Sequence, residues 1–280
     1  MDKNGMTAPN NYAENAALKQ RFVRVMGGPL GTGGRGAVAL RCDHGLANFR
    51  DRVLPLTVAR RISVSQAYNP RNWHYPENAG VTIEELDDWV ADGRVEIWNH
   101  SASHASAESA AQLRDQIVGG LQEIQEQLPA ARGKVWGWSP PGVKGGYGGY
   151  DGGKRPEGWH TPAGRMILKH HAVAQGSLYR THLRVLDGTP RVGLARYQMD
   201  SRAVDDIVAT IDTAARERLG LQLMIHPSVL DKPGFLTTAE LEAVLDHIVT
   251  HRERGQLKTL SPYQLLVADA SLAEAMGTSG

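Results

Sequence analysis

Short apolar runs alternate with longer amphipathic stretches along most of this 280-residue chain, and this alternation constrains the fold more than any other feature. The apolar runs have the length of strands and lie at residues 37–42, 62–68, 95–98, 134–138, 191–199 and 221–225. The stretches between and after them fit helices at residues 51–60, 82–91, 105–128, 202–218 and 237–252. Strands that alternate with helices build mostly parallel sheets, either open or closed into a barrel. The pattern therefore predicts a single α/β domain.

The ends of the chain and two glycine-rich stretches are expected to lie outside the regular core. Residues 1–36 form a polar and glycine-rich arm, residues 37–270 the domain, and residues 271–280 a loose tail. The arm contains GTGGRG, which formally matches a dinucleotide-binding fingerprint. A strand follows it where that motif needs a helix, so we interpret it as a connector. Residues 142–153 are predicted to form a long functional loop.

Charge and composition exclude several classes of protein. The formal net charge is +1 and no basic stripe is present, so nucleic acid is not an expected partner. The single cysteine, Cys42, cannot form an intrachain disulfide, and we interpret it as a small buried hydrophobe. Residues 1–20 hold no apolar run, so we expect no signal peptide and no membrane span. The expected location is cytoplasmic, or virion-associated or extracellular by a non-classical route.

Histidines and one carboxylate follow three of the predicted strands directly. Asp43 and His44 follow the first strand, residues 100–104 (HSASH) follow the strand at 95–98, and His226 follows the strand at 221–225. In α/β folds, functional sites gather at the carboxyl ends of strands. His100 and His104 are four residues apart, a spacing that on one helical turn lets two side chains share a metal.

Each of these residues also has a structural interpretation. Asp43 suits a capping residue of the turn after its strand, because Asp-His-Gly is a turn sequence. His44 could be a loop histidine without a metal, and His226 a core histidine with its hydrogen bonds satisfied. His170 and His171 fit a helix end better than a pair of ligands.

Four short motifs together resemble those of the polysaccharide deacetylases, the NodB-like carbohydrate esterases of family 4. They are CDHG at residues 42–45, HSASH at 100–104, WSPPG at 138–142 and MIH at 224–226, in the family's order and spacing. The resemblance spans residues 37–227. It implies an irregular (β/α) barrel of the NodB type and the metal-assisted hydrolysis of an N- or O-acetyl group on a glycan.

The resemblance implies one divalent metal. His100 and His104 match two ligands of the family, and His44 stands where the family has a metal-binding Asp. Three imidazoles with open positions for water and substrate form a sound zinc site, which cobalt or nickel would also occupy. We therefore expect Zn²⁺ at His44, His100 and His104.

The resemblance also implies roles in the reaction. Asp43 matches the catalytic base, and His226 matches the acid that protonates the leaving amine or alcohol. A backbone N–H near Pro141 and Gly142 would stabilise the oxyanion. The family often has an Arg in its third motif that holds the base, but this chain has Ser139 there. Arg41 is the substitute that we consider for that role.

Two other functions stay open because of the substitutions at His44 and Ser139. One is a catalytically impaired glycan-binding or structural module of a larger assembly, such as a phage tail, present as a homo-oligomer or in a virion. The other is a different amide hydrolase on the same scaffold. For a glycan substrate, a cleft lined with aromatic residues is expected.

Aromatic residues are assigned to the cleft or to the core by their position. Trp138, Tyr147 and Tyr150 are expected to face the glycan, whereas Trp98 and Trp136 are expected to pack in the core. The acidic residues of the helix at 202–218 are expected to form a solvated face. They are Asp205, Asp206 and Asp212.

Overall fold

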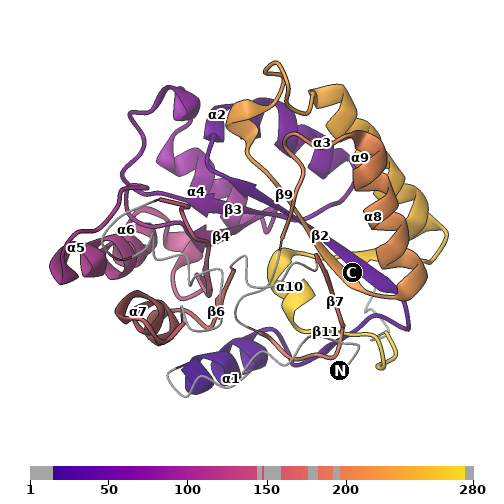
Figure 1. The fold of residues 1–280 in the computed structure, drawn as a ribbon, viewed down its shortest axis with the longest axis horizontal. Helices are drawn as coiled ribbons and strands as arrows, with labels where there is room; N and C mark the ends of the chain where they lie inside the picture. The colour runs from indigo at the N-terminus through magenta and orange to yellow at the C-terminus, as the bar shows by residue number, and fades with distance from the viewer. Residues whose placement is uncertain (1–14, 144–146, 148–158, 176–181, 192–195, 275–280) are drawn as a thin grey trace.

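A curled, mostly parallel sheet with helices packed around it forms the body of the protein (Figure 1). The computed structural model describes residues 15–143, 147, 159–175, 182–191 and 196–274. The sheet has the strand order β6-β5-β4-β3-β2-β9-β7, with β10 also paired to β2 and β8 to β9. The strands are β2 (Gly36–Asp43), β3 (Val64–Tyr68), β4 (Val95–Asn99), β5 (Gly137–Trp138), β6 (Val173–Ala174), β7 (Leu183–Arg184), β8 (Tyr197–Gln198), β9 (Gly220–Ile225) and β10 (Leu257–Thr259). This arrangement confirms the predicted α/β class with a mostly parallel sheet.

The strand β2 lies at the centre, and all of its residues are buried. It pairs in parallel with β3, β9 and β10. Parallel strands are covered on both faces and therefore read as continuous apolar runs, which made β2 recognisable in the sequence. The predicted strand at 191–199 is shorter, since only β8 is regular in its described part.

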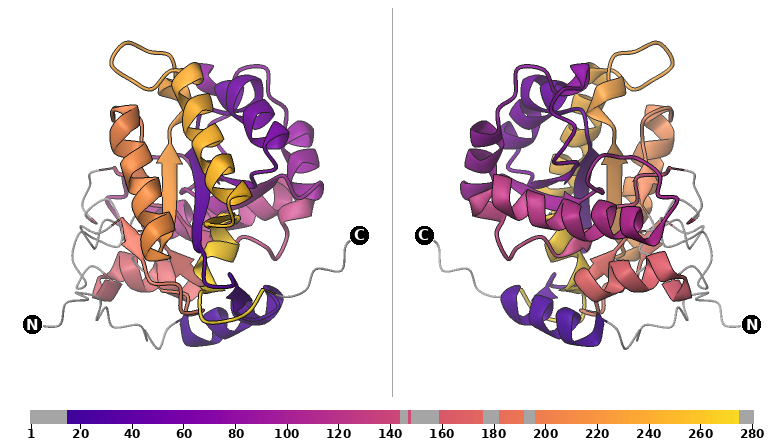
Figure 2. Two further views of the ribbon diagram at one scale, coloured as in Figure 1. Left: turned by 90° about the vertical axis from the view of Figure 1, so that its right-hand side faces the viewer. Right: turned by 90° about the vertical axis from the view of Figure 1, so that its left-hand side faces the viewer.

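Helices cover the sheet on its outer side. α8 (Val204–Glu217) packs on β2, and α9 (Thr238–Glu253) packs against α8, at the right of Figure 1 and from the side in Figure 2. At the left of Figure 1 lies α4 (Ile83–Ala91), which begins with a capping box formed by Thr82 and Glu85. Two further helices are α7 (Pro162–His170) and α10 (Pro262–Leu266).

Two predicted helices contain π-helical turns. The helix expected at 51–60 is α2 (Leu46–Asn48), a π turn over Phe49–Val53 and α3 (Leu54–Ala59). The helix expected at 105–128 is α5 (Ala110–Arg114), a π turn over Asp115–Gly119 and α6 (Gly120–Gln127). The predicted start of the second helix at residue 105 was wrong. Ser109 caps α5 by accepting a hydrogen bond from Gln112 N, so the helix begins after it. Residues 100–109 are therefore loop, which matters for the site.

The described part of the N-terminal segment packs on the domain. In α1 (Ala16–Val25), Phe22 is buried, with its ring 5.9 Å from that of Trp136 and 5.7 Å from that of Tyr263. The short strand β1 (Leu30–Gly31) pairs in parallel with β11 (Ala268–Asp269). Segments from the two ends of the described chain thus lie side by side on the domain.

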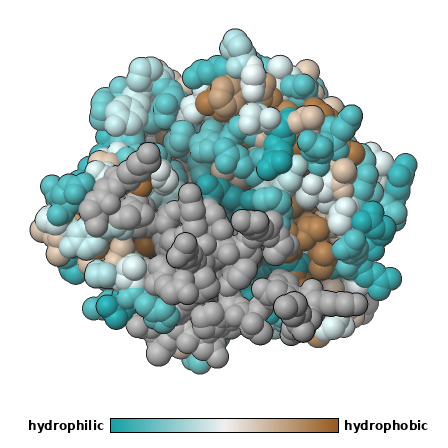
Figure 3. Space-filling view, in the orientation of Figure 1, coloured by the Kyte–Doolittle hydropathy of each residue, from teal (hydrophilic) through white to brown (hydrophobic). Residues whose placement is uncertain are grey.

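The surface in the view of Figure 3 is mostly hydrophilic, and hydrophobic residues form small separate groups on it. Within the described residues, no helix is both long and apolar enough to cross a membrane.

Candidate metal centre

The carboxyl ends of β2, β4 and β9 bring four histidines together. The ring of His44 lies 4.9 Å from that of His226 and 5.6 Å from that of His104, and the rings of His100 and His104 are 5.0 Å apart. One nitrogen from each of His44, His100 and His104 lies within 4.8 Å of the other two. The three imidazoles are thus close enough to share one ion, and metal binding by them stays a prediction.

His44 is placed by a turn that follows β2 directly. Its φ of 42° is left-handed, and its backbone N–H donates to Ala67 O at 3.2 Å. Gly45 is also left-handed, and a Cβ there would lie 2.4 Å from Ser228 N, so this position requires glycine. Glu77 Oε1 lies 3.2 Å from His44 Nδ1. The hydrogen bond to His44 lowers the pKa of Glu77 more than burial raises it.

His100 is buried, and only one of its two ring nitrogens has a hydrogen-bond partner among the described residues. Its Nδ1 lies 2.9 Å from the backbone oxygen of Ser139, so Nδ1–H donates and Nε2 carries the free lone pair. Among the described residues, this buried Nε2 has no hydrogen-bond partner. Burial, together with the nearby His104 and His44, holds the pKa of His100 well below its usual value. A neutral imidazole with an oriented, unused nitrogen is the form that binds metal.

His104 reaches the site from a loop and not from a helical turn, so that part of the prediction was wrong. Ser101 and His104 have left-handed φ values of 72° and 59°. The hydroxyl of Ser101 accepts a hydrogen bond from His104 N at 3.0 Å. The loop therefore folds back on itself, and the four-residue spacing brings the two imidazoles together through this turn.

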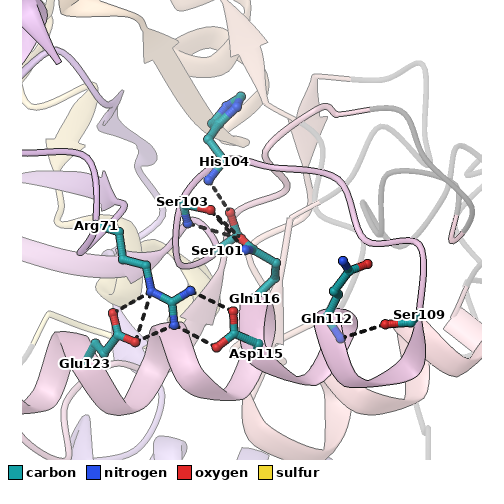
Figure 4. A network of polar contacts seen from close by, with 9 residues as sticks. All are labelled: Arg71, Ser101, Ser103, His104, Ser109, Gln112, Asp115, Gln116 and Glu123. Atoms are coloured by element: carbon teal, nitrogen blue, oxygen red, sulfur yellow. Dashed lines mark hydrogen bonds and ion pairs between the residues drawn. The ribbon is translucent and has the colours of Figure 1, made fainter. Parts of the chain in front are cut away.

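The loop of His104 rests on the π turn between α5 and α6 (Figure 4). Gln116 accepts from Ser103 N at 3.1 Å through its side chain, and its backbone oxygen accepts from Ala102 N at 2.9 Å. A Cβ on Gly120 would lie 2.7 Å from Ala102 N, so only glycine permits this close approach.

Two ion pairs of Arg71 connect the loop that follows β3 to the same helices. Arg71 donates through Nη1 to Asp115 at 2.6 Å and through Nε to Glu123 at 2.9 Å (Figure 4). Its backbone N–H donates to Ala102 O at 3.1 Å. The position of His104 is thus supported from two sides.

Asp43 is a buried carboxylate beside these histidines. Arg41, two residues earlier on β2 and also buried, donates to its Oδ2 at 2.6 Å. Burial alone would raise the pKa of Asp43, but the charges of Arg41 and His226 outweigh it and hold the pKa well below its usual range. Its other oxygen, Oδ1, is buried and has no hydrogen-bond partner within the described residues. The site therefore contains an ionised carboxylate with one free oxygen.

His226 is held by a second carboxylate. Asp200 accepts from His226 N at 2.7 Å and lies 2.6 Å from its Nδ1. Burial alone would lower the pKa of His226, but the hydrogen bond to Asp200 and the charge of Asp43 raise it above the ordinary value. The carboxylate of Asp200 thus orients the imidazole through Nδ1 and favours its protonated form.

Comparisons with known proteins give the fold of the chain and nothing finer. No family model matches the sequence, and no curated protein matches it. A structure from Mycobacterium smegmatis described as a polysaccharide deacetylase has a TM-score of 0.54 at 13% identity, over 85% of this chain and 90% of its own. An allantoinase has a TM-score of 0.52 at 16% identity, over 80% of this chain and 71% of its own. A family 4 carbohydrate esterase from Streptomyces lividans, in complex with acetate, has a TM-score of 0.47 at 14% identity, over 84% and 97%.

The chain has the NodB-like polysaccharide deacetylase fold. In this NodB-like chain the cation that pairs with Asp43 comes from β2 itself. Ser139, which stands in place of the expected Arg, is fully buried and contributes its backbone oxygen to His100 instead. The interpretation of Arg41 as the partner of Asp43 is confirmed by their 2.6 Å contact.

The three aromatic residues predicted to line the cleft have different surroundings. The prediction for Trp138 was wrong: it is fully buried against Trp159 and Ile167, because β5 is an inner strand of the sheet. Tyr147 is partly buried against the same cluster, and Tyr150 lies outside the described residues. The assignment of two other tryptophans to the core was right; they are Trp98 and Trp136.

The structure also places the proline loop, the cysteine and the histidine pair at the end of α7. Pro141 is buried, while Gly142 is exposed with a left-handed φ of 69°. Cys42 is buried, and burial raises the pKa of its thiol well above the usual value, which agrees with a core residue. His170 ends α7 and His171 caps it, as expected.

Asp200 is the main site residue that the sequence analysis missed. It comes two residues after β8, at the carboxyl end of a strand that pairs in parallel with β9. The rule that located Asp43 and His226 would have located it as well. Glu77 has no such signal, because it lies in a short turn between β3 and α4.

Proposed function

We propose that this protein is a metal-dependent hydrolase that removes N- or O-acetyl groups from a glycan. The observation that carries the proposal is the unused, buried Nε2 of His100 beside two further imidazoles and an ionised Asp43. A buried polar atom without a partner is costly, and a bound cation would satisfy it. The donor set of three imidazole nitrogens fits Zn²⁺, with cobalt or nickel as alternatives.

A divalent metal bound to His44, His100 and His104 would act as a Lewis acid toward the acetyl carbonyl and would acidify a water molecule. The residues of the chain supply the proton transfers. Asp43, with its free Oδ1, accepts a proton from the attacking water. His226, whose raised pKa favours the protonated form, donates a proton from Nε2 to the leaving amine or alcohol.

The low pKa of Asp43 limits its strength as a base. Arg41 favours the ionised carboxylate, and the lowered pKa also makes Asp43 a weak base. Asp43 would therefore accept the proton only from a water that a metal held by the three histidines had made more acidic. The backbone N–H of Gly142 is our candidate for oxyanion stabilisation.

The proposal of a glycan substrate rests on the four sequence motifs and on the similarity in fold to the structure from Mycobacterium smegmatis described as a polysaccharide deacetylase. The test is acetate release by the purified protein from a panel of acetylated glycans, with zinc or cobalt and with chelator. We expect metal-dependent release that is lost in His104→Ala together with the metal. Asp43→Asn should keep the metal and lose about 10²–10⁴-fold in rate.

Two other results would redirect the function. Metal binding without acetate release from any glycan would favour a binding or structural module. Hydrolysis of small amides, allantoin among them, without action on glycans would favour an amide hydrolase on this scaffold. Full activity in Asp43→Asn would overturn the assignment of the base.

A further inference from the structure

A second cluster of metal-binding side chains lies between α8 and α9, outside the centre described above. Asp212 comes from α8, and His247 and His251 come from α9, four residues apart on one helical face. One ligand atom from each lies within 4.8 Å of the other two. The prediction that Asp212 belongs to a solvated face was therefore incomplete, because its side chain bridges two helices.

The three donor atoms converge on one point. Asp212 Oδ1 lies 2.6 Å from His247 Nε2 and 2.7 Å from His251 Nε2, and the two nitrogens are 3.2 Å apart. Donors at zinc distances in a tetrahedral site are roughly 3.3 Å apart. The nitrogens already have this separation, and Asp212 would need to withdraw by about 0.6 Å, a small change for a half-exposed side chain.

The hydrogen bonds of His251 allow it to act as a metal ligand. Its Nε2 faces Asp212 Oδ1, and its Nδ1 lies 2.6 Å from Gln256 Oε1, so both nitrogens face oxygen atoms. A neutral imidazole has a single N–H and can donate to only one of them. With Nδ1–H donating to Gln256, Nε2 presents a lone pair toward Asp212 and His247. Metal-bound histidines commonly have this arrangement, in which an outer hydrogen bond fixes the tautomer.

The cluster is separate from the first centre along the sheet. Asp212 lies shortly before β9 begins at Gly220, and His251 shortly before β10 begins at Leu257. It therefore lies toward the amino ends of these strands, whereas His44, His100 and His104 follow carboxyl ends. The two clusters share no residue.

We infer that Asp212, His247 and His251 bind a second divalent cation of the zinc, cobalt or nickel class, which links α8 to α9. Two imidazoles and one carboxylate are donors that these metals accept. Three protein ligands leave a position for water, and the side chains are 29% and 44% exposed at His247 and Asp212, so a metal can enter from solution. The bound cation would hold α9, which packs on β10, to α8, which packs on β2 and β9.

The test is a titration of the metal-free full-length protein with Co²⁺, followed by d–d absorption and by calorimetry. We expect two equivalents per wild-type chain and one in His247→Ala. His100→Ala should also bind one equivalent, at the cluster between α8 and α9. His74→Ala, which removes an exposed histidine from neither cluster, should still bind two.

The variants distinguish the two metal centres. If His247→Ala and the double variant His247→Ala/His251→Ala bind as much Co²⁺ as His74→Ala, the second site is refuted. A wild-type protein that binds one equivalent, and loses it only in His100→Ala, refutes it too. One equivalent that is lost only in His247→Ala would support the second site and contradict the first.

A hydrogen-bonding variant separates a metal site from a plain ion pair. Gln256→Leu leaves all three ligands in place, and we expect about a 10–100-fold weaker Co²⁺ affinity at this cluster alone. Zn²⁺ at a hundredfold excess over Kd should raise Tm by roughly 5–10 °C in His100→Ala. No rise in Tm there, with unchanged affinity in Gln256→Leu, would contradict the inference.

Discussion

Arg41 and Asp43 form an ion pair in which both side chains are fully buried, with Arg41 Nη2 at 2.6 Å from Asp43 Oδ2. Two positions apart on β2, they project from the same face of the sheet. Burial lowers the pKa of Arg41 to about 10, so each partner depends on the other to remain charged in the interior. Breaking such a pair leaves one buried charge without compensation, which costs about 3–5 kcal/mol.

Arg41→Met should therefore destabilise the protein in a pH-dependent way. Without Arg41, burial raises the pKa of Asp43, and a raised carboxyl pKa makes the folded state less stable as pH increases. We expect a loss of about 3–5 kcal/mol at pH 8 and a smaller loss at pH 5, measured by urea denaturation. Arg94→Met, which breaks the exposed pair with Asp92, should cost about 0–1 kcal/mol. Equal losses for the two variants would refute the role of the buried pair.

The raised pKa of His226 should set the alkaline limb of the activity profile. The acid must be protonated, so kcat/KM falls as pH rises through this pKa. Asp200→Asn removes the charge that raises it, and the limb should move to lower pH by about 1–2 units. Asp246→Asn, which removes an exposed carboxylate paired with Arg60, is the matched control. An alkaline limb that stays in place in Asp200→Asn would show that His226 is not the titrating acid.

The close approach of α6 to the His104 loop can be tested by a pair of adjacent glycines. In Gly120→Ala the new Cβ meets the backbone of Ala102, so we expect a loss of about 1–3 kcal/mol and weaker metal binding. In Gly119→Ala the nearest atom is 3.0 Å away on the side chain of Asp115, which can move. That variant should be neutral or stabilised by up to about 1 kcal/mol. Thermal unfolding and Co²⁺ titration of both variants provide the comparison, and identical behaviour would contradict the role of Gly120.

The fold was largely predictable, because strands buried on both faces leave continuous apolar runs in the sequence. The site was predictable where polar residues follow such strands, as at Asp43, His100 and His226. It was not predictable where backbone atoms act, as at Ser139 O. Asp200 follows the strand predicted at 191–199, so the same rule covers it, but the rule was not applied there. The second cluster joins residues from different helices, and nothing in the spacing along the chain indicates that contact.

A partly buried carboxylate outside both clusters should make stability depend on pH. Burial raises the pKa of Glu96 to about 7, and its Oε2 accepts from Tyr263 N at 2.9 Å. The folded state then binds more protons than the unfolded state between about pH 4.5 and 7, so stability falls as pH rises through this range. Glu96→Gln should gain roughly 2–4 kcal/mol relative to the wild type between pH 5 and pH 8. Exposed Glu126→Gln should show no such gain, and the absence of any gain in Glu96→Gln would show that Glu96 ionises normally.

The central claim is that His44, His100 and His104 hold the metal. The most direct measurement is anomalous scattering at the zinc edge from zinc-loaded crystals of the wild-type protein. We expect a peak about 2.0–2.1 Å from one nitrogen of each of the three imidazoles. A zinc-loaded crystal without a peak at these histidines, even with the cluster between α8 and α9 occupied, would contradict the claim.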